Sequence, residues 1–219
     1  MNVSHRFVII AAIFVTCLIT ANIIAVKIIS LGPIFLPAAI IVFPLSYIFG
    51  DILTEVYGYH WARKVIWLGF ICNLIFVIFV WIGQMLPPAP FWEGQEAYQS
   101  ILGFTRRLLA ASFCGYLVGE FANSFVLAKM KIMTRGRWLW TRTIGSTIVG
   151  QGLDSLIFIT IAFVGTSSFV PIVILYHWLA KTVIEAAATP LTYALVNFLK
   201  KKETIDTYDY QTNFNPFMV

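Results

Sequence analysis

Long apolar runs separated by short polar connections are the dominant pattern of this sequence. Each run is apolar around its whole circumference, which is typical of helices surrounded by lipid or by other helices. A bilayer core needs about 20 apolar residues per helical crossing. The pattern therefore predicts an all-α, polytopic membrane protein, a single transmembrane domain over residues 1–219 with six spanning helices. The expected spans are 7–29, 33–50, 65–86, 108–128, 143–165 and 171–198.

Composition supports this prediction and excludes a soluble domain. Hydrophobic residues make up 59% of the chain and charged residues only 11%, whereas soluble domains carry about 25% charged residues. The first run is too long for a cleaved signal peptide, so we interpret it as a span. The second run is the weakest because it contains Pro33, Pro37 and Pro44. Since proline frees backbone groups that neighbours must satisfy, we expect this span to be kinked or partly unwound.

Basic residues are concentrated on one side of the predicted spans. Lys27, Arg106 and Arg107 lie on the opposite side, and Lys181 lies inside a span. The positive-inside rule therefore predicts that both termini are cytoplasmic. The same rule explains the net charge of +5, so we expect the lipid bilayer and no nucleic acid as a partner. The basic residues expected to be cytoplasmic are Arg6, Arg63, Lys64, Lys129, Lys131, Arg135, Arg137, Arg142, Lys200, Lys201 and Lys202.

Charged residues interrupt the last three runs near their centres. Glu120, Asp154 and Lys181 each lie roughly 15–18 Å into a run at a rise of 1.5 Å per residue, which is the depth of the bilayer midplane. With Glu185 they would cost on the order of 10 kcal/mol if unpaired. Such groups are kept where they face one another or a cavity.

The spacing of the polar residues places them on single helical faces, because positions three and four apart are neighbours on a helix. We therefore predict a polar pocket between the last three spans, completed by Asn22 and Asn73. The three stripes are Tyr116, Glu120 and Asn123; Thr147, Gln151 and Asp154; and His177, Lys181, Glu185 and Thr189.

From these stripes we select candidate binding residues. The candidates for substrate binding are Glu120, Asn123, Gln151, Asp154, Lys181 and Glu185. Secondary or gating candidates are Tyr116, Asp51, Glu55, Thr147, Trp178 and Asn22. The functional interpretation is strongest for Glu120 and Asp154, which have no obvious cation nearby in the sequence.

Simpler structural interpretations stay open for the other candidates. In one interpretation, Lys181 and Glu185, which are four residues apart, neutralise each other as a buried structural pair. Amide and hydroxyl side chains such as Asn123, Gln151 and Thr147 commonly hydrogen-bond across membrane helices. His177, close to the predicted outer interface, is more readily structural. Asp51 and Glu55 are placed for an interfacial salt bridge to Arg63 and Lys64 as well as for a gate.

The expected pocket has a definite chemistry. Carboxylates accept hydrogen bonds from paired N–H donors and lysine donates to a carbonyl, while Tyr116, Phe121 and Trp178 could stack a flat ring. A planar heterocycle with an amide-like edge fits this set. Cys17, Cys72 and Cys114 lie in apolar runs without metal-ligand spacing, so we expect no disulfide, metal or cofactor. The chain has no GxSxG or HExxH arrangement, so we expect no enzyme.

A weak internal similarity links two of the runs. The segment YIFGDILTE, which begins at Tyr47, matches YLVGEFANS, which begins at Tyr116, at four of nine positions. Chance explains such a match as well as a parallel repeat does.

Four segments together resemble a known family. They are FPLSYIFGDILTEVYGYHWARK (43–64), GEFANSFVLAKMK (119–131), GSTIVGQGLDSLIF (145–158) and KTVIEAAATPLTYALV (181–196), and the resemblance is to the VUT family of queuosine precursor transporters. It implies a multi-pass protein of the bacterial inner membrane that imports 7-cyano-7-deazaguanine, and also 7-aminomethyl-7-deazaguanine, for conversion to queuosine in tRNA.

The chemistry of the predicted pocket suits the guanine-like edge of those bases. We expect Glu120 or Asp154 to accept the ring N–H and exocyclic amine, Gln151 and Asn123 to bind the rest of the edge, and Lys181, held charged by Glu185, to donate to O6.

Two other classes of protein stay open. One is a six-span substrate-binding subunit of an energy-coupling-factor importer, which would need partner ATPases because this chain has no GxxxxGK[ST] loop. The other is a structural membrane protein in which the polar residues serve packing only. The energy source stays open, and so does assembly into a homo-oligomer.

Overall fold

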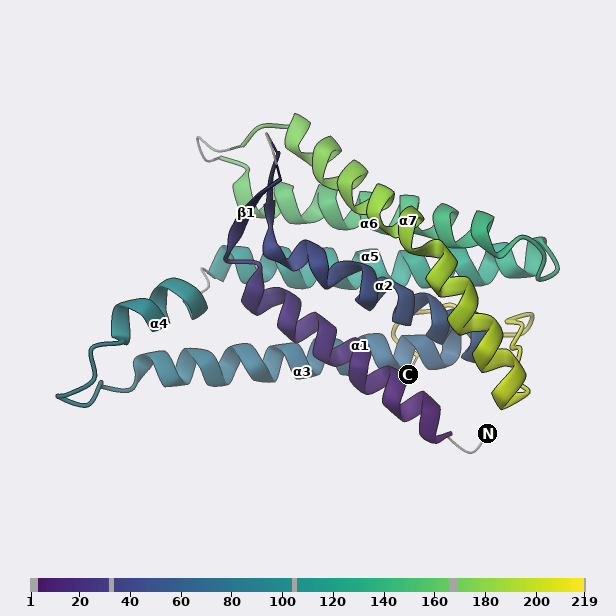
Figure 1. Ribbon diagram of the computed structural model, residues 1–219, viewed down its shortest axis with the longest axis horizontal. Helices are drawn as coiled ribbons and strands as arrows, with labels where there is room; N and C mark the ends of the chain where they lie inside the picture. The colour runs from purple at the N-terminus through teal and green to yellow at the C-terminus, as the bar shows by residue number, and fades with distance from the viewer. Residues whose placement is uncertain (1–3, 32–33, 104–105, 166–168, 219) are drawn as a thin grey trace.

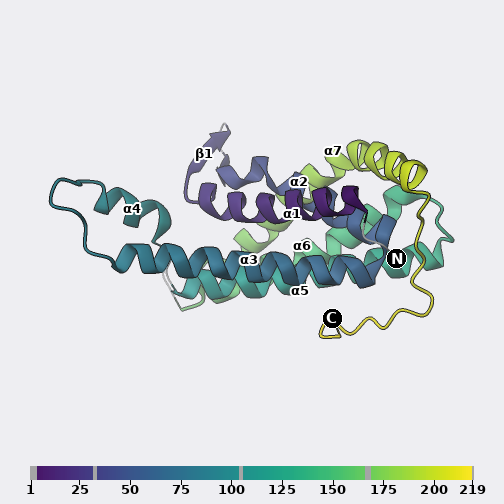
Figure 2. The same ribbon diagram turned by 90° about the horizontal axis from the view of Figure 1, so that it is seen from below.

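A computed structural model describes residues 4–31, 34–103, 106–165 and 169–218. Long helices laid side by side dominate it (Figures 1 and 2). The helices are α1 (His5–Ile24), α2 (Phe43–Ile52), α3 (Tyr59–Met85), α4 (Gln95–Leu102), α5 (Arg106–Met133), α6 (Leu139–Phe163) and α7 (Ile172–Glu203). The all-α prediction is confirmed in its main features, with the addition of one small β-hairpin.

Five segments are long and apolar enough to cross a membrane. They are α1, α3, the stretch Gln95–Met133 that contains α5, α6 and α7. Their outward faces are apolar: Phe79 and Trp81 on α3, for example, are 69% and 52% exposed. Water-soluble proteins rarely expose such side chains over a whole face, so lipid is the solvent that suits this surface.

The second predicted span, 33–50, contains only a short helix, which confirms the expectation that this span is partly unwound. The chain here forms an antiparallel hairpin of β1 (Ile28–Leu31) and β2 (Ile34–Pro37), with Ile28 opposite Pro37. A 3₁₀ turn (Ala38–Ile41), the ten-residue α2 and a π turn, η2 (Leu53–Tyr57), follow. Proline has no N–H to donate and fixes its φ angle, which accounts for the short helix. The first span also ends earlier than predicted, at Ile24 rather than at residue 29.

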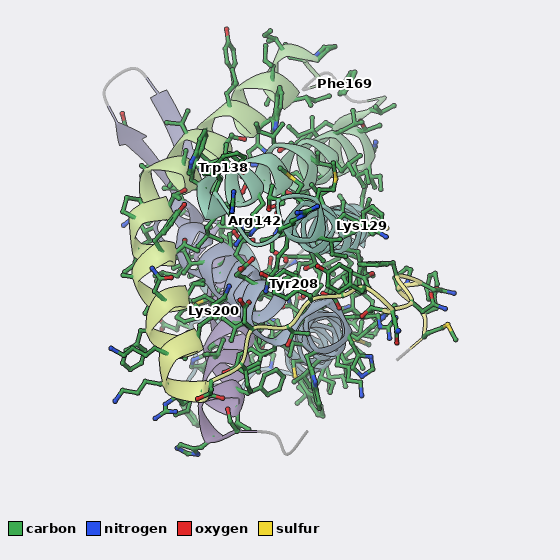
Figure 3. The ribbon with its side chains drawn as sticks, turned by 90° about the vertical axis from the view of Figure 1, so that its right-hand side faces the viewer. Lys129, Trp138, Arg142, Phe169, Lys200 and Tyr208 are labelled. Atoms are coloured by element: carbon green, nitrogen blue, oxygen red, sulfur yellow. The ribbon has the colours of Figure 1, made fainter. Side chains whose placement is uncertain are left out.

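The remaining predicted spans correspond to helices, with shifted ends. Helix α3 begins at Tyr59 rather than at residue 65, and α7 continues to Glu203 rather than to residue 198. Polar and aromatic residues at these ends remain helical because they pack on the C-terminal segment, 204–218, which crosses the end of the bundle (Figure 3). The extent of the apolar run alone therefore underestimates the length of both helices.

Close contact between α5 and α6 fixes the depth of the polar residues. A Cβ atom on Gly150 would lie 2.7 Å from the Asn123 Cβ and 2.9 Å from the Gly119 carbonyl oxygen. Glycine pairs of this kind let membrane helices approach closely. The contact brings Asn123 of α5 and Asp154 of α6 to the centre of the bundle.

The two ends of the bundle differ in character. The hairpin, α4, the end of α6 and the start of α7 lie at one end, which we call the hairpin end (Figure 1). The first residues of α1, the loop between α5 and α6, and the last turn of α7 lie at the other, the basic end (Figure 1). The C-terminal segment turns back along the bundle from the basic end (Figure 2).

Candidate functional site

An ion pair joins α6 and α7 in the middle of the bundle. The Lys181 Nζ lies 2.5 Å from Asp154 Oδ2, and both residues are buried. Asp154, which has no cation nearby in the sequence, therefore has one in the structure, supplied by α7. Lys181 thus donates across to α6, while its pairing with Glu185 along α7 stays an open interpretation.

Glu185 is bound by neutral groups from α6. The Thr147 hydroxyl donates to its Oε1 at 2.6 Å, and the Gln151 amide donates to its Oε2 at 3.5 Å. Between α5 and α2, the Asn123 amide donates to Asp51 Oδ1 at 2.9 Å. The hydrogen-bonding role that sequence allowed for these amides is thus confirmed, and their partners are carboxylates.

Glu120 differs from these carboxylates. It is 2% exposed, and its Oε2 has no hydrogen-bond donor among the described residues. A Cβ atom on Gly50 of α2 would lie 3.3 Å from this oxygen, so the Glu120 carboxyl group packs closely against α2. A buried carboxyl group without donors is costly, and such a group is a candidate acceptor for a ligand.

A cavity of about 140 Å³ lies beside Glu120. Of the predicted candidates, Asn22, Tyr116, Glu120, Asp154 and Lys181 line it, together with the expected Asn73. Asn123, Gln151, Glu185, Thr147 and Asp51 are not in its wall, although all are buried. They form a layer behind the wall that holds the charged groups in place. The cavity reaches from mid-bundle toward the hairpin end, where Ala25 and Pro37 line it.

Sequence reasoning missed several wall residues. Tyr47 of α2 lines the cavity opposite Tyr116 of α5, so the two matching tyrosines of the internal similarity meet at one site. His177 also lines it, with its Nδ1 2.9 Å from the Ser155 hydroxyl. The signal that could have found Tyr47 was its match to Tyr116. The other newly identified wall residues are Leu18, Ala21, Ser46, Ser112, Phe113 and Phe158.

Two of the three aromatic rings expected to stack a ligand, Phe121 and Trp178, lie outside the cavity wall. The Trp178 indole donates to the Ile148 carbonyl at 2.9 Å and covers Gly152, and Phe121 packs against Trp67. Neither ring lines the cavity. Phe113 and Phe158 are the phenyl rings in its wall.

The hairpin end of the cavity carries a neutral polar cluster. The Asn22 amide donates to Asn73 Oδ1 at 3.0 Å, and the Ser112 hydroxyl lies 3.5 Å from Asn22 Oδ1. These three residues come from α1, α3 and α5, and all three line the cavity. The cluster therefore ties three helices together at the cavity wall.

The basic end is closed by a second set of charges, centred on Glu55 of η2. Arg142 binds both Glu55 carboxyl oxygens at 2.8 Å, and the Lys200 Nζ lies 2.5 Å from Oε1. Lys131 adds a third cation at 3.6 Å. Glu55 is fully buried. Salt bridging of Glu55 is confirmed, but the expected partners, Arg63 and Lys64, are wrong.

The C-terminal segment completes this closure. Lys131 donates to Asp206 at 2.5 Å and to the Thr207 carbonyl at 2.7 Å, and the Thr207 N–H donates to the Val56 carbonyl at 3.2 Å. Figure 3 shows Tyr208 on this segment, in front of the helices that carry Arg142 and Lys200. Partial burial raises the pKa of Asp206, but Lys131 and Lys200 outweigh it and hold that pKa below its ordinary value.

The same segment also binds the start of α3. Asp209 accepts a hydrogen bond from the Tyr59 N–H at 3.0 Å, next to Gly58, whose φ of 86° favours glycine. A carboxylate at this position satisfies a free N–H group and complements the helix dipole. Arg63 donates to the Asn215 carbonyl at 2.5 Å. The long beginning of α3, unforeseen from the sequence, is explained by these contacts.

Within residues 4–31, 34–103, 106–165 and 169–218, no group of three His, Cys, Asp or Glu side chains is arranged to hold a metal ion. What the cavity offers is an acceptor, Glu120, a donor, Lys181, neutral amides and aromatic rings. These groups are suited to binding and orienting a polar, flat molecule.

Spanning helices that surround a polar cavity, closed by charges at one end, define a membrane transporter. The chain belongs to the family described as "Putative vitamin uptake transporter", whose model matches residues 37–195. It is therefore a multi-pass membrane protein and a transporter rather than an enzyme, and the expected bacterial inner-membrane location is supported by its relatives.

Curated relatives narrow the family further. The chain is 32% identical to the "Probable queuosine precursor transporter" of Bacillus subtilis over 70% of this chain and 68% of that protein. It is 27% identical to the "Queuosine precursor transporter" of Escherichia coli, over 55% and 52%. A Haemophilus influenzae relative, also named "Probable queuosine precursor transporter", is 26% identical over 55% and 49%. The match thus covers about half the length of the last two. No solved structure matches the chain.

Proposed function

We propose that this protein imports 7-deazaguanine precursors of queuosine. The preferred substrate in this proposal is 7-cyano-7-deazaguanine, and the 7-aminomethyl form is a second substrate. The names of the relatives support the substrate class. The observation that carries the proposal is the cavity lined by Glu120, a buried residue whose Oε2 has no hydrogen-bond partner among the described residues. A guanine-like edge offers N–H donors to such a carboxyl group.

The proposed binding mode revises the roles drawn from sequence. Glu120, rather than Asp154, accepts the ring N–H and the exocyclic amine, because Asp154 is already bound to Lys181. Lys181, in the cavity wall and oriented by Asp154, donates to O6. Phe113 and Phe158 contact the faces of the ring.

The amides take a supporting role in this proposal. Asn123 and Gln151 hold the carboxylates Asp51 and Glu185 in the layer behind the wall, instead of binding the substrate edge as expected from sequence.

We further propose six crossings with both termini in the cytoplasm. The composite segment Ile34–Tyr57 is the second crossing, because it starts at the hairpin end and finishes at the Glu55 cluster at the basic end. The cavity then opens toward the outside while the Glu55 cluster and the C-terminal segment close the cytoplasmic side. Transport requires this inner closure to open, which gives Glu55 the gating role expected from sequence.

Two other readings are separable by experiment. A substrate-binding subunit of an energy-coupling-factor importer would bind the base but transport it only with its partner ATPases. A structural membrane protein would bind no base at all. The residue set in the cavity wall favours a binding protein over the structural alternative, since an unpartnered buried carboxyl group adds nothing to packing.

Calorimetric titration of the purified protein in detergent with 7-cyano-7-deazaguanine tests the proposal. We expect saturable binding that Glu120→Gln weakens at least tenfold, since hydrogen bonds to a charged group contribute about 1.5–3 kcal/mol and about 1.4 kcal/mol is tenfold in affinity. Glu96→Gln, on exposed helix α4, is the matched control and should bind like the parent. No binding by the parent, or equal binding by Glu120→Gln, would contradict the proposal.

A further inference from the structure

We propose that Asn73, with Asn22 and Ser112, reads the substituent at position 7 of the base and selects the neutral nitrile over the cationic aminomethyl group. This inference rests on the proposed function, because it assigns the second end of the same cavity. Its basis is the difference in charge between the two ends of the cavity wall.

The first step is distance along α5. Ser112 and Glu120 lie on this helix two turns apart, roughly 12 Å at 1.5 Å per residue, and both line the cavity. A bicyclic base with a short substituent, hydrogen-bonded at both ends, is of this length. When Glu120 holds the guanine-like edge, position 7 therefore points toward Ser112 and the two asparagines.

The second step is the charge of each wall group. Three charged groups line the cavity, Glu120, Asp154 and Lys181. Glu120 lies at the other end of the cavity, two turns along α5 from Ser112, and Asp154 is paired with Lys181 at 2.5 Å. Among the described wall residues, no unpaired carboxylate then lies beside an ammonium group at the neutral cluster. A buried cation without a counter-ion is strongly disfavoured.

The third step is the chemistry of the neutral cluster. Asn73 accepts from the Asn22 amide at 3.0 Å through Oδ1, which orients its NH₂ group as the donor for a ligand. Asn73 is 4% exposed and lines the cavity, so its position is fixed by packing on α3. A nitrile nitrogen is an acceptor without N–H groups, and it matches an amide donor. An ammonium group brings only donors and a charge.

A comparison of the affinities of the two bases for the parent and for Asn73→Asp tests the inference. Calorimetry measures the affinity of each purified protein for 7-cyano- and 7-aminomethyl-7-deazaguanine. For the parent we expect the nitrile to bind at least tenfold more tightly. Asn73→Asp should reverse this order, because the added carboxylate pairs with the ammonium group and repels the nitrile. Asn22→Asp is the second variant, in case Asn73→Asp does not fold.

Each outcome separates this inference from the proposed function. If neither base binds to the parent, the proposed function fails. If both bind with equal affinity, or if the preference is the same in both aspartate variants, the proposed function stands and the inference is overturned. Glu120→Gln should weaken both bases by a similar factor, since the edge that it binds is common to them.

Discussion

At the scale of single residues, the chain places four carboxyl groups in mid-bundle and satisfies them in different ways. Asp154 has an ammonium partner, Asp51 and Glu185 have neutral donors, and Glu120 has no donor for Oε2 among the described residues. Burial of a carboxyl group costs free energy at all four positions, and an ion pair or hydrogen bonds offset this cost at three of them. The remaining group marks the place for a ligand.

The Asp154–Lys181 pair gives a prediction of stability. Either Asp154→Asn or Lys181→Met should lower the free energy of unfolding by about 3–5 kcal/mol, because one charge then stays buried without its partner. The double variant Asp154→Asn/Lys181→Met should be more stable than either single variant. Thermal unfolding in detergent, arranged as a double-mutant cycle, measures this coupling. Additive losses would show that the two side chains do not stabilise each other.

At the scale of elements, the C-terminal segment and η2 close the basic end of the bundle. The Thr207 N–H binds the Val56 carbonyl at 3.2 Å, while Asp206 and Asp209 hold the segment to α5 and α3. Because the pKa of Asp206 is lowered in the folded protein, its contribution is present above its unfolded pKa. That contribution is lost as the pH falls through the lowered value. The closure is thus held by charge at neutral pH.

A disulfide across this contact should stop transport. We expect Val56→Cys/Thr207→Cys, in a background without the native cysteines, to lose uptake in proteoliposomes on oxidation and to regain it with a thiol reductant. Base binding from the opposite side should persist in the oxidised protein. Each single cysteine, treated with the same oxidant, is the control. Full uptake by the cross-linked protein would show that this contact does not open during transport.

Sequence pattern predicted some elements well and others poorly, for physical reasons. The last three spans and the polar stripes of Glu120, Asp154 and Lys181 follow from apolar length and helical spacing, and the structure places all three residues in one cavity wall. The partners of Lys181 and Glu55 depend on contacts between helices, which spacing along one helix does not contain. The early start of α3 likewise depends on contacts with the C-terminal segment.

At the scale of the whole molecule, the cavity and the closure lie in series along the bundle. The cavity reaches from mid-bundle toward the hairpin end, and the buried charges of Glu55, Arg142 and Lys131 fill the basic end. In the proposed orientation this is an outward-facing arrangement, in which a ligand enters from outside and meets a closed cytoplasmic side. Alternating access then consists of exchanging which end is closed.

The central claim is that this chain alone moves a 7-deazaguanine base across a membrane. Uptake of labelled 7-cyano-7-deazaguanine into proteoliposomes that contain only the purified protein tests it most directly, with Glu120→Gln and Glu96→Gln in parallel. We predict saturable uptake by the parent and by Glu96→Gln, and at least tenfold slower uptake at low substrate concentration by Glu120→Gln. Binding without uptake would favour a subunit that needs partner ATPases, and the claim would be contradicted.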